Sequence, residues 1–187
     1  MTDARLRRFA DLLLRWNLSL NLIAARDADV VWERHIADSL QLVPLMPPGL
    51  DRAVDLGTGG GFPGLVLAIA TGMAFDLIES DRRKASFLRT AILETGAPAT
   101  VHCCRIEDAA VPPAGLVTAR ALAPLPRLLP LAARFLRDDG VCLFLKGAKV
   151  EEELTAAARD WSMTADRVPS QTGTDGVILR VSGLRRR

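Results

Sequence analysis

The 187-residue sequence is poor in several residue types: it has no tyrosine and only three lysines, three cysteines and two histidines. Its cysteines, Cys103, Cys104 and Cys142, are odd in number and form no C-x-x-C pair. This pattern favours neither a disulfide framework nor a structural zinc site, and a reducing cytoplasm is the expected compartment. With so few histidines as well, we expect no metal ion.

The sequence also lacks a strong charge excess and a membrane span. Lys and Arg total 24 against 22 Asp and Glu, so total charge does not indicate nucleic-acid binding, and a polyanionic partner would need a local basic patch. The longest uncharged run, residues 56–75, is too rich in glycine to form one helix in lipid. Since the first residues also lack an apolar signal stretch, we expect no membrane association.

Regular apolar patterns indicate an α/β fold. Leu6, Phe9, Leu13 and Trp16 have helical spacing, and we interpret residues 1–49 as an N-terminal helical extension. In residues 50–187, short apolar runs alternate with helical ones, which predicts a mostly parallel sheet with helices on both faces, forming one unit with the extension. The expected strands are residues 53–56, 75–79, 99–104, 115–118, 141–146, 163–168 and 176–182, and the expected helices are 63–71, 82–95, 125–137 and 150–161.

A glycine-rich loop, D-L-G-T-G-G-G-F-P-G at residues 55–64, follows the first expected strand. Glycine permits positive φ and a close approach of ligand to backbone, so we expect a nucleotide-like ligand here. Gly59, Gly61 and Gly64 match a dinucleotide fingerprint, in which a pyrophosphate meets bare amides at a helix start. Asp55, Gly57, Gly59 and Gly61 instead match S-adenosylmethionine-dependent methyltransferases, where a carboxylate can meet the cationic amino-acid end of the cofactor. The early Asp55 favours the methyl donor.

An acidic residue, Glu79, closes the second expected strand, 22 residues after Gly57. From this place a carboxylate can accept hydrogen bonds from both ribose hydroxyls of a nucleotide. Capping of the next helix, or pairing with Arg83, is the alternative. Both candidate ligands would use Glu79 in the same way.

Together with this loop, the sequence resembles one family, the bacterial ribosomal RNA small-subunit methyltransferase G family, also called glucose-inhibited division protein B. The resemblance covers residues 16–180 and rests on the order and spacing of its segments. These are Trp16-Asn17, Asn21-Leu22, residues 34–40 and 55–64, Glu79-Ser80, Lys84, residues 87–89, 105–107 and 120–125, and Lys146-Gly147.

The resemblance implies a class I S-adenosylmethionine-dependent methyltransferase fold, Rossmann-like with a mostly parallel seven-stranded sheet, that methylates N7 of one guanine in 16S ribosomal RNA. Carried over by position, the cofactor contacts are Gly57, Phe62, Ile106, Glu107 and Arg120. The Ile106-Glu107 pair would frame the adenine. Arg120 would face both the methyl donor and the incoming base, and it is the candidate catalytic residue.

Guanine N7 carries a lone pair and no proton, so its methylation needs positioning and no general base. Other nucleic-acid methylations leave marks that this sequence lacks. Cytosine C5 transfer needs a nucleophilic cysteine after proline, and we interpret the three cysteines as core residues. Adenine N6 transfer uses an Asn/Asp-Pro-Pro-aromatic turn, whereas Ala121-Leu122-Ala123-Pro124 stands here.

The best regional excess of basic residues lies in residues 105–149, with seven basic and four acidic side chains. Arg105, Lys146 and Lys149 are therefore the candidate RNA contacts, with simple solvation as the alternative. The role of His35 and Asp38 stays open, and we favour a link between the extension and the sheet.

The partner implied by the resemblance is the small ribosomal subunit, and a monomer is expected. Two other functions remain open. The chain could methylate a small molecule or a protein, or it could bind a nucleotide without methyl transfer.

Overall fold

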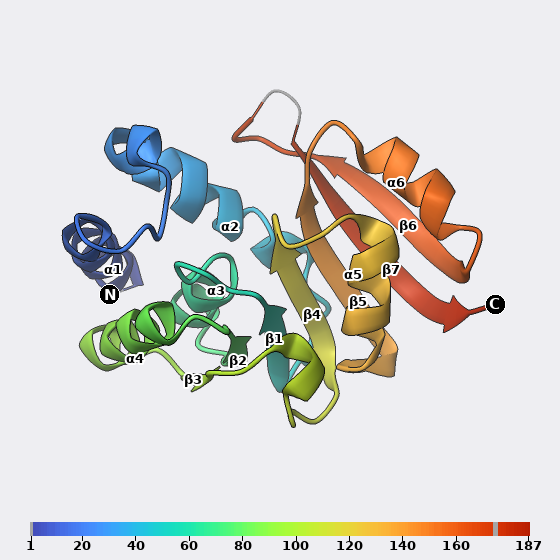
Figure 1. Ribbon diagram of the computed structural model, residues 1–187, viewed down its shortest axis with the longest axis horizontal. Coiled ribbons are helices and arrows are strands. Elements are labelled where there is room, and N and C mark those ends of the chain that lie inside the picture. The colour runs from blue at the N-terminus through green and yellow to red at the C-terminus, as the bar shows by residue number, and fades with distance from the viewer. Residues whose placement is uncertain (1, 174–175) are drawn as a thin grey trace.

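The computed structural model describes residues 2–173 and 176–187 (Figure 1). Its strands are β1 (Arg52–Leu56), β2 (Ala74–Ile78), β3 (Ala99–His102), β4 (Ala114–Arg120), β5 (Leu136–Lys146), β6 (Trp161–Pro169) and β7 (Val177–Arg186). Its α-helices are α1 (Thr2–Asn17), α2 (Asp38–Leu40), α3 (Gly64–Thr71), α4 (Arg82–Thr95), α5 (Leu125–Ala133) and α6 (Val150–Ala157). Shorter helical turns are η1 (Ala25–Val30), η2 (Trp32–Ala37), η3 (Val43–Leu45) and η4 (Ile106–Asp108).

These strands form a seven-stranded sheet in the order β3-β2-β1-β4-β5-β7-β6. Neighbours from β3 to β5 are parallel, whereas β7 runs antiparallel to both β5 and β6. The prediction of a mostly parallel sheet is confirmed. The chain leaves β1 toward β2 and later returns to place β4 on the other side of β1, so the order of connection reverses between these two central strands.

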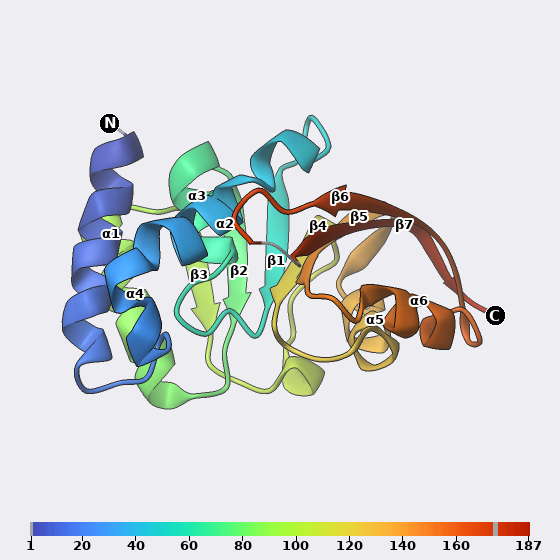
Figure 2. The same ribbon diagram turned by 90° about the horizontal axis from the view of Figure 1, so that it is seen from above.

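Helices cover both faces of the sheet and create two separate cores (Figure 2). The extension packs with α3 and α4 on one face, where Phe9, Leu13 and Phe87 are fully buried. On the other face α5 and α6 bury Leu128, Leu129 and Leu154 against the strands. Right-handed crossovers explain this division, because β1-α3-β2 and β2-α4-β3 run in one direction along the sheet and β4-α5-β5 runs in the other.

Several element bounds differ from the sequence prediction. β3 ends at His102, so Cys103 and Cys104 lie half-buried beyond it, and only Cys142 is a buried strand residue. α5 ends at Ala133 rather than near residue 137, because β5 begins at Leu136 and pairs there with the first residue of β4. α6 ends at Ala157, since Trp161 already belongs to β6. Pairing between distant strands decided these bounds, which local periodicity does not report.

The segment between α1 and β1, interpreted from the sequence only as part of a helical extension, is divided into several short helical pieces. η1 is a 3-10 helix, η2 a π-helix and α2 a short α-helical turn. A π-helical turn widens the backbone and often marks a functional region. Here it carries His35 toward the glycine loop and places Asp38 near the end of β4.

No helix in the described part of the chain combines the length and the apolar character needed to cross a bilayer.

Candidate active site

The candidate site lies at the carboxyl ends of the central strands. Ligands of open α/β sheets bind where the order of connection reverses, which here is between β1 and β4. The glycine loop leaves β1 at this point, Glu79 follows β2, and Arg120 ends β4. The strand order therefore brings three sequence-predicted residues to one edge.

The glycine loop has a backbone that only glycine adopts easily. Gly57 and Gly59 have φ of +63° and +57°, in the left-handed region. A Cβ on Gly59 would meet only the Gly57 carbonyl oxygen, at an ordinary contact distance of 3.9 Å, whereas a Cβ on Gly57 would come within 2.7 Å of Leu122 Cδ1. The loop thus presents bare backbone at Gly59 and lies under the Leu122 side chain at Gly57.

Glu79 is buried and joined directly to this loop. Its Oε2 accepts a hydrogen bond from Gly59 N at 2.9 Å, and its Oε1 accepts one from Asp81 N at 2.8 Å. The helix α4 is capped by Asp81, and Arg83 donates to the Ser19 carbonyl, so neither alternative role of Glu79 is seen. Each carboxylate oxygen retains a second lone pair that can accept from a ribose hydroxyl.

Asp55 lies beneath the loop and is fully buried. Its Oδ2 accepts from Gly64 N at 3.0 Å, and its Oδ1 accepts from the Thr118 hydroxyl at 2.7 Å. Burial raises the pKa of this carboxyl to about 6. In this arrangement Asp55 connects β1, the start of α3 and β4, and it reaches a ligand only through the loop that it holds.

Phe62 connects the loop to Arg120 and to the extension. The guanidinium carbon of Arg120 lies 4.7 Å from the centre of the Phe62 ring, and the His35 ring centre lies 5.0 Å away. Phe9 packs edge-on at 5.6 Å. Since Phe62 is almost fully buried, its side chain acts as a support, and Arg120 is the member of this cluster that borders the adjacent pocket.

Arg120 is itself held by protein partners. Its Nη1 lies 3.5 Å from Asp38 Oδ2 and 3.4 Å from the Arg34 carbonyl oxygen. Burial lowers the pKa of Arg120, and Asp38 opposes that effect. An arginine remains charged in proteins, so a partly buried cation is fixed at the end of β4.

His35, in the η2 turn of the extension, is buried against Phe62, and neither of its ring nitrogens forms a hydrogen bond with a described residue. Its Nε2 lies 3.4 Å from Asp27 Oδ2. Burial, reinforced by the nearby charge of Arg120, lowers its pKa from 6.5 to about 4. The ring is therefore neutral at neutral pH and packs as a flat, largely apolar surface.

Replacing His35 with glutamine is expected to change how stability depends on pH. In the wild type the unfolded chain binds a proton near pH 6.5 and the folded chain only near pH 4, so acidification through this window destabilises the fold. In the wild type this effect lowers the free energy of unfolding by about 2–3 kcal/mol at pH 4.5, and the variant, which lacks the imidazole, does not show it. Urea unfolding at pH 7 and pH 4.5 measures it; an equal difference between the two proteins at both values contradicts the prediction.

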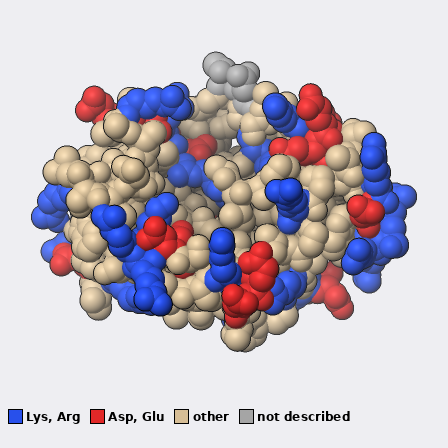
Figure 3. Space-filling model, viewed as in Figure 1, with Lys and Arg blue, Asp and Glu red and all other residues tan. Residues whose placement is uncertain are grey.

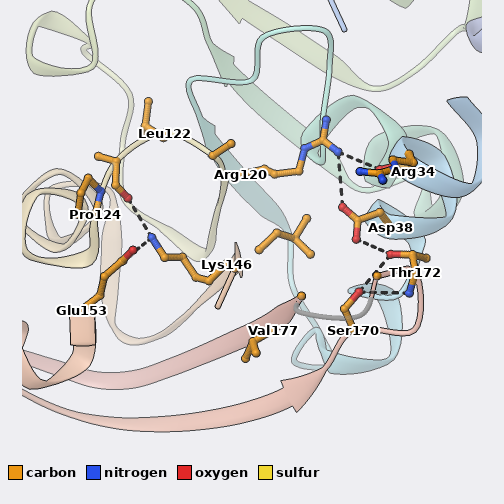
Figure 4. Close-up of a pocket in the computed structure, with 16 residues that line it drawn as sticks. Arg34, Asp38, Arg120, Leu122, Pro124, Lys146, Glu153, Ser170, Thr172 and Val177 are labelled. Atoms are coloured by element: carbon orange, nitrogen blue, oxygen red, sulfur yellow. Dashed lines mark hydrogen bonds and ion pairs between the residues drawn. The ribbon is translucent and has the colours of Figure 1, made fainter. Parts of the chain in front are cut away.

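A pocket of about 820 Å³ opens beside Arg120 (Figure 4). Its lining includes Arg120 and residues at the ends of β4 and β5 and at the start of β7, but no residue of the glycine loop. One wall carries Arg120, Asp38 and Thr172, and the other carries Lys146 and Glu153. This volume falls in the range of small-molecule sites, about 300–1,000 Å³.

The remaining predicted residues are dispersed. Ile106 begins η4 and packs in the same core cluster as the last residues of β1 and β2, while Glu107 beside it is exposed. Of the three candidate RNA contacts, Arg105 and Lys149 are exposed, and Lys146 lines the pocket. Lys146 is paired with Glu153 at 2.5 Å, so it is not a freely solvated cation.

Several residues in and around the pocket carry no signal that the sequence analysis identified. Thr172 donates to Asp38 at 2.7 Å, and Gln41 donates to Asp38 at 2.8 Å and to Ser170 at 3.0 Å. These bonds fix the β6–β7 hairpin to the extension. Glu153 was missed as well, because a single glutamate among the three acidic residues at the start of α6 carries no local signal.

Among the residues described, no group of three or more His, Cys, Asp or Glu side chains is placed to hold a metal ion.

Solved structures share the fold. An O-methyltransferase from Bacillus cereus, determined in complex with SAH, superimposes with a TM-score of 0.64 at 18% identity, covering 93% of this chain and 90% of that one. The structure of M. jannaschii TYW2 in complex with AdoMet superimposes with a TM-score of 0.62 at 15% identity and covers 82% of this chain and 76% of that one. The fold is that of the class I S-adenosylmethionine-dependent methyltransferases.

Sequence comparison identifies the family. A family model described as rRNA small subunit methyltransferase G matches residues 2–176. A protein of that name from Gluconobacter oxydans is 54% identical over 185 residues, which cover 99% of this chain and 95% of the relative. Another from Acidiphilium cryptum is 58% identical over 184 residues, which cover 97% of this chain and 85% of the relative. The chain belongs to the ribosomal RNA small-subunit methyltransferase G family, and its cofactor is S-adenosylmethionine.

Proposed function

We propose that this chain transfers a methyl group from S-adenosylmethionine to N7 of one guanine in 16S ribosomal RNA, and that Arg120 positions the two reactants. The observation that carries the proposal is the location of Arg120. Its guanidinium stacks on Phe62 of the glycine loop and also lines the neighbouring pocket. A cofactor on the loop and a base in the pocket would therefore meet at this residue.

The residues around the loop fit the cofactor. Bare backbone at Gly59 admits a close ligand, and Gly57 and Gly61 keep the loop in its positive-φ path. The unused lone pairs of Glu79 suit the two ribose hydroxyls. Ile106 and Glu107 offer an apolar and a polar side chain for the adenine, and Asp55 supports the loop from below.

Bound S-adenosylmethionine supplies an electrophilic methyl group on a positively charged sulfur. Guanine N7 has a lone pair and no proton, so the chain needs to supply no general base. Arg120 would donate to the neighbouring acceptor O6, which leaves the N7 lone pair directed toward the loop. Correct orientation of this kind can account for up to about 7–11 kcal/mol of rate acceleration.

The finer assignments complete the proposal. The substrate partner is the small ribosomal subunit, the enzyme acts as a cytoplasmic monomer, and residues 1–49 serve as an extension of the methyltransferase domain at residues 50–187. Arg105 and Lys149 would contact phosphates. On the face drawn in Figure 3, Lys and Arg side chains are interspersed with acidic ones and form no single basic block, so contact with RNA would be made by separate cations.

Replacing Gly59 with alanine is expected to weaken S-adenosylmethionine binding by about tenfold or more, because a side chain at φ +57° strains the loop by about 1–2 kcal/mol and occupies the ligand's place. Gly72 provides a matched control at the end of α3, with φ +74° and open space around a Cβ. Calorimetric titration should show reduced affinity for Gly59→Ala alone. Equal affinities for the two variants would refute the assignment of the loop.

Substrate class is tested by following a labelled methyl group. The enzyme is incubated with labelled cofactor and, separately, with assembled small subunits, naked ribosomal RNA and an RNA-free extract. Label is expected in RNA, as 7-methylguanosine after nuclease digestion. Label on protein or on small molecules alone would overturn the RNA assignment, and binding of NAD without S-adenosylmethionine would overturn methyl transfer altogether.

A further inference from the structure

The pocket beside Arg120 has a polar wall opposite that arginine, and the proposed chemistry does not account for it. Lys146 projects from the end of β5 and Glu153 from α6 (Figure 4). We propose that this pair selects guanine over adenine by contacting O6, N1–H and the N2 amino group of the target base. The inference rests on the proposed function, because it assumes that the base enters this pocket.

Lys146 has one donor to spare. Its ammonium donates to the Ala123 carbonyl at 3.0 Å and to Glu153 Oε2 at 2.5 Å. Only a tenth of its side chain is exposed, so these bonds fix the ammonium at the pocket wall. An ammonium carries three N–H donors, and the two bonds above are those that Lys146 forms with described residues, so one donor is left on a side chain that lines the pocket.

Glu153 has one oxygen to spare. Its Oε2 accepts from Lys146 and, at 2.7 Å, from the backbone amide of Leu125 at the start of α5. Its Oε1 forms no hydrogen bond to any described residue, although the side chain is only 19% exposed and lines the pocket. The pair thus offers a donor beside an acceptor, both held in place by their other bonds.

This order of donor and acceptor matches guanine. Guanine O6 has two lone pairs, so it can accept from Arg120 on the N7 side and from Lys146 on the N1 side, and the N1–H and N2–H donors that follow it suit Glu153. Adenine presents the opposite order, with an amino donor at position 6 and an acceptor at N1. Its amino group would face the Lys146 ammonium, and its N1 lone pair would face the Glu153 carboxylate. Sites that satisfy buried polar groups with one ligand strongly reject an analogue that leaves them unpaired.

The same placement keeps N7 on the cofactor side. In guanine, N7 lies on the far side of O6 from N1, so a base whose N1 faces Glu153 directs N7 toward the opposite wall. That wall is Arg120, which contacts the glycine loop through Phe62. Apolar side chains of Leu122, Leu145 and Val177 line the space between the two walls and suit the faces of a flat base.

The test combines changes in the protein with a change in the base. After the methylated guanine has been mapped, small-subunit RNA is assembled with guanosine or with inosine at that position; inosine lacks only the N2 amino group. Wild-type kcat/KM should be about tenfold to a hundredfold lower for inosine, the effect of losing a hydrogen bond to a charged acceptor. In Glu153→Gln, the rate on guanosine should fall and the ratio between the two RNAs should approach one.

Glu152→Gln is the matched control, since Glu152 is the exposed neighbour of Glu153 on α6 and carries the same charge. It should keep both the wild-type rate and the wild-type ratio. Thermal unfolding and S-adenosylmethionine affinity verify the fold of each variant. If Glu153→Gln does not fold, Glu153→Asp takes its place, because it keeps the charge and withdraws the carboxylate.

The outcomes distinguish failure of guanine selection by Lys146 and Glu153 from failure of the proposed methyl transfer. A wild-type enzyme that methylates both RNAs equally, or a folded Glu153 variant with the wild-type ratio, overturns the selection of guanine by Lys146 and Glu153. A wild-type enzyme that methylates neither RNA overturns the proposed function instead.

Discussion

Replacing Arg120 with alanine is expected to lower methyl transfer by about a hundredfold or more, the cost of misplacing a reacting group by about 1 Å. The guanidinium lies between the loop and the pocket, 4.7 Å from the Phe62 ring and 3.5 Å from Asp38. Without it, the pocket loses the cation that stacks on Phe62 of the glycine loop. Single-turnover methylation of small subunits at saturating cofactor measures the loss.

A fall in stability must be distinguished from this loss of positioning. Removal of Arg120 leaves Asp38 without its cation, and we expect the free energy of unfolding to fall by about 1–3 kcal/mol, which a domain stable by about 5–15 kcal/mol tolerates. Arg127→Ala is the control, because Arg127 is an exposed arginine on α5. A folded Arg120→Ala protein with full activity would remove Arg120 from the mechanism.

The sequence predicted those parts of the fold whose signals are local. Alternating apolar runs gave the order of strands and helices, and α4 has the predicted bounds, Arg82–Thr95, because Asp81 caps its start and Gly96 its end. The glycine motif predicted a loop after the first strand, and the structure places it after β1. Parallel strands then bring the loop, Glu79 and Arg120 to one edge.

The pocket could not be predicted, because its residues meet only after folding. Asp38, Arg120, Glu153 and Thr172 come from four separate elements or loops, and none has a motif of its own. Charge counting placed Lys146 on an RNA-facing surface, yet the structure pairs it with Glu153. Composition registers how many cations a segment holds but not which of them are already paired.

Replacing Asp55 with alanine is expected to lower the free energy of unfolding by about 2–4 kcal/mol, because it leaves two buried donors without an acceptor. These donors are Gly64 N–H and the Thr118 hydroxyl, at 3.0 and 2.7 Å. The variant should unfold about 5–15 °C lower. Differential scanning calorimetry at pH 7 measures the shift, and an unchanged transition would show that the carboxylate does not support the loop.

Thr118→Val distinguishes support of the loop from direct contact with the cofactor. Thr118 is fully buried on β4, and its hydroxyl donates to the Asp55 carboxylate that holds the loop. If Asp55 acts by holding the loop, Thr118→Val should reduce both stability and S-adenosylmethionine affinity, and Asp55→Ala/Thr118→Val should cost less than the sum of the single changes, since donor and acceptor then leave together. If Asp55 instead binds the cofactor directly, affinity should fall for Asp55→Ala and stay at the wild-type value for Thr118→Val.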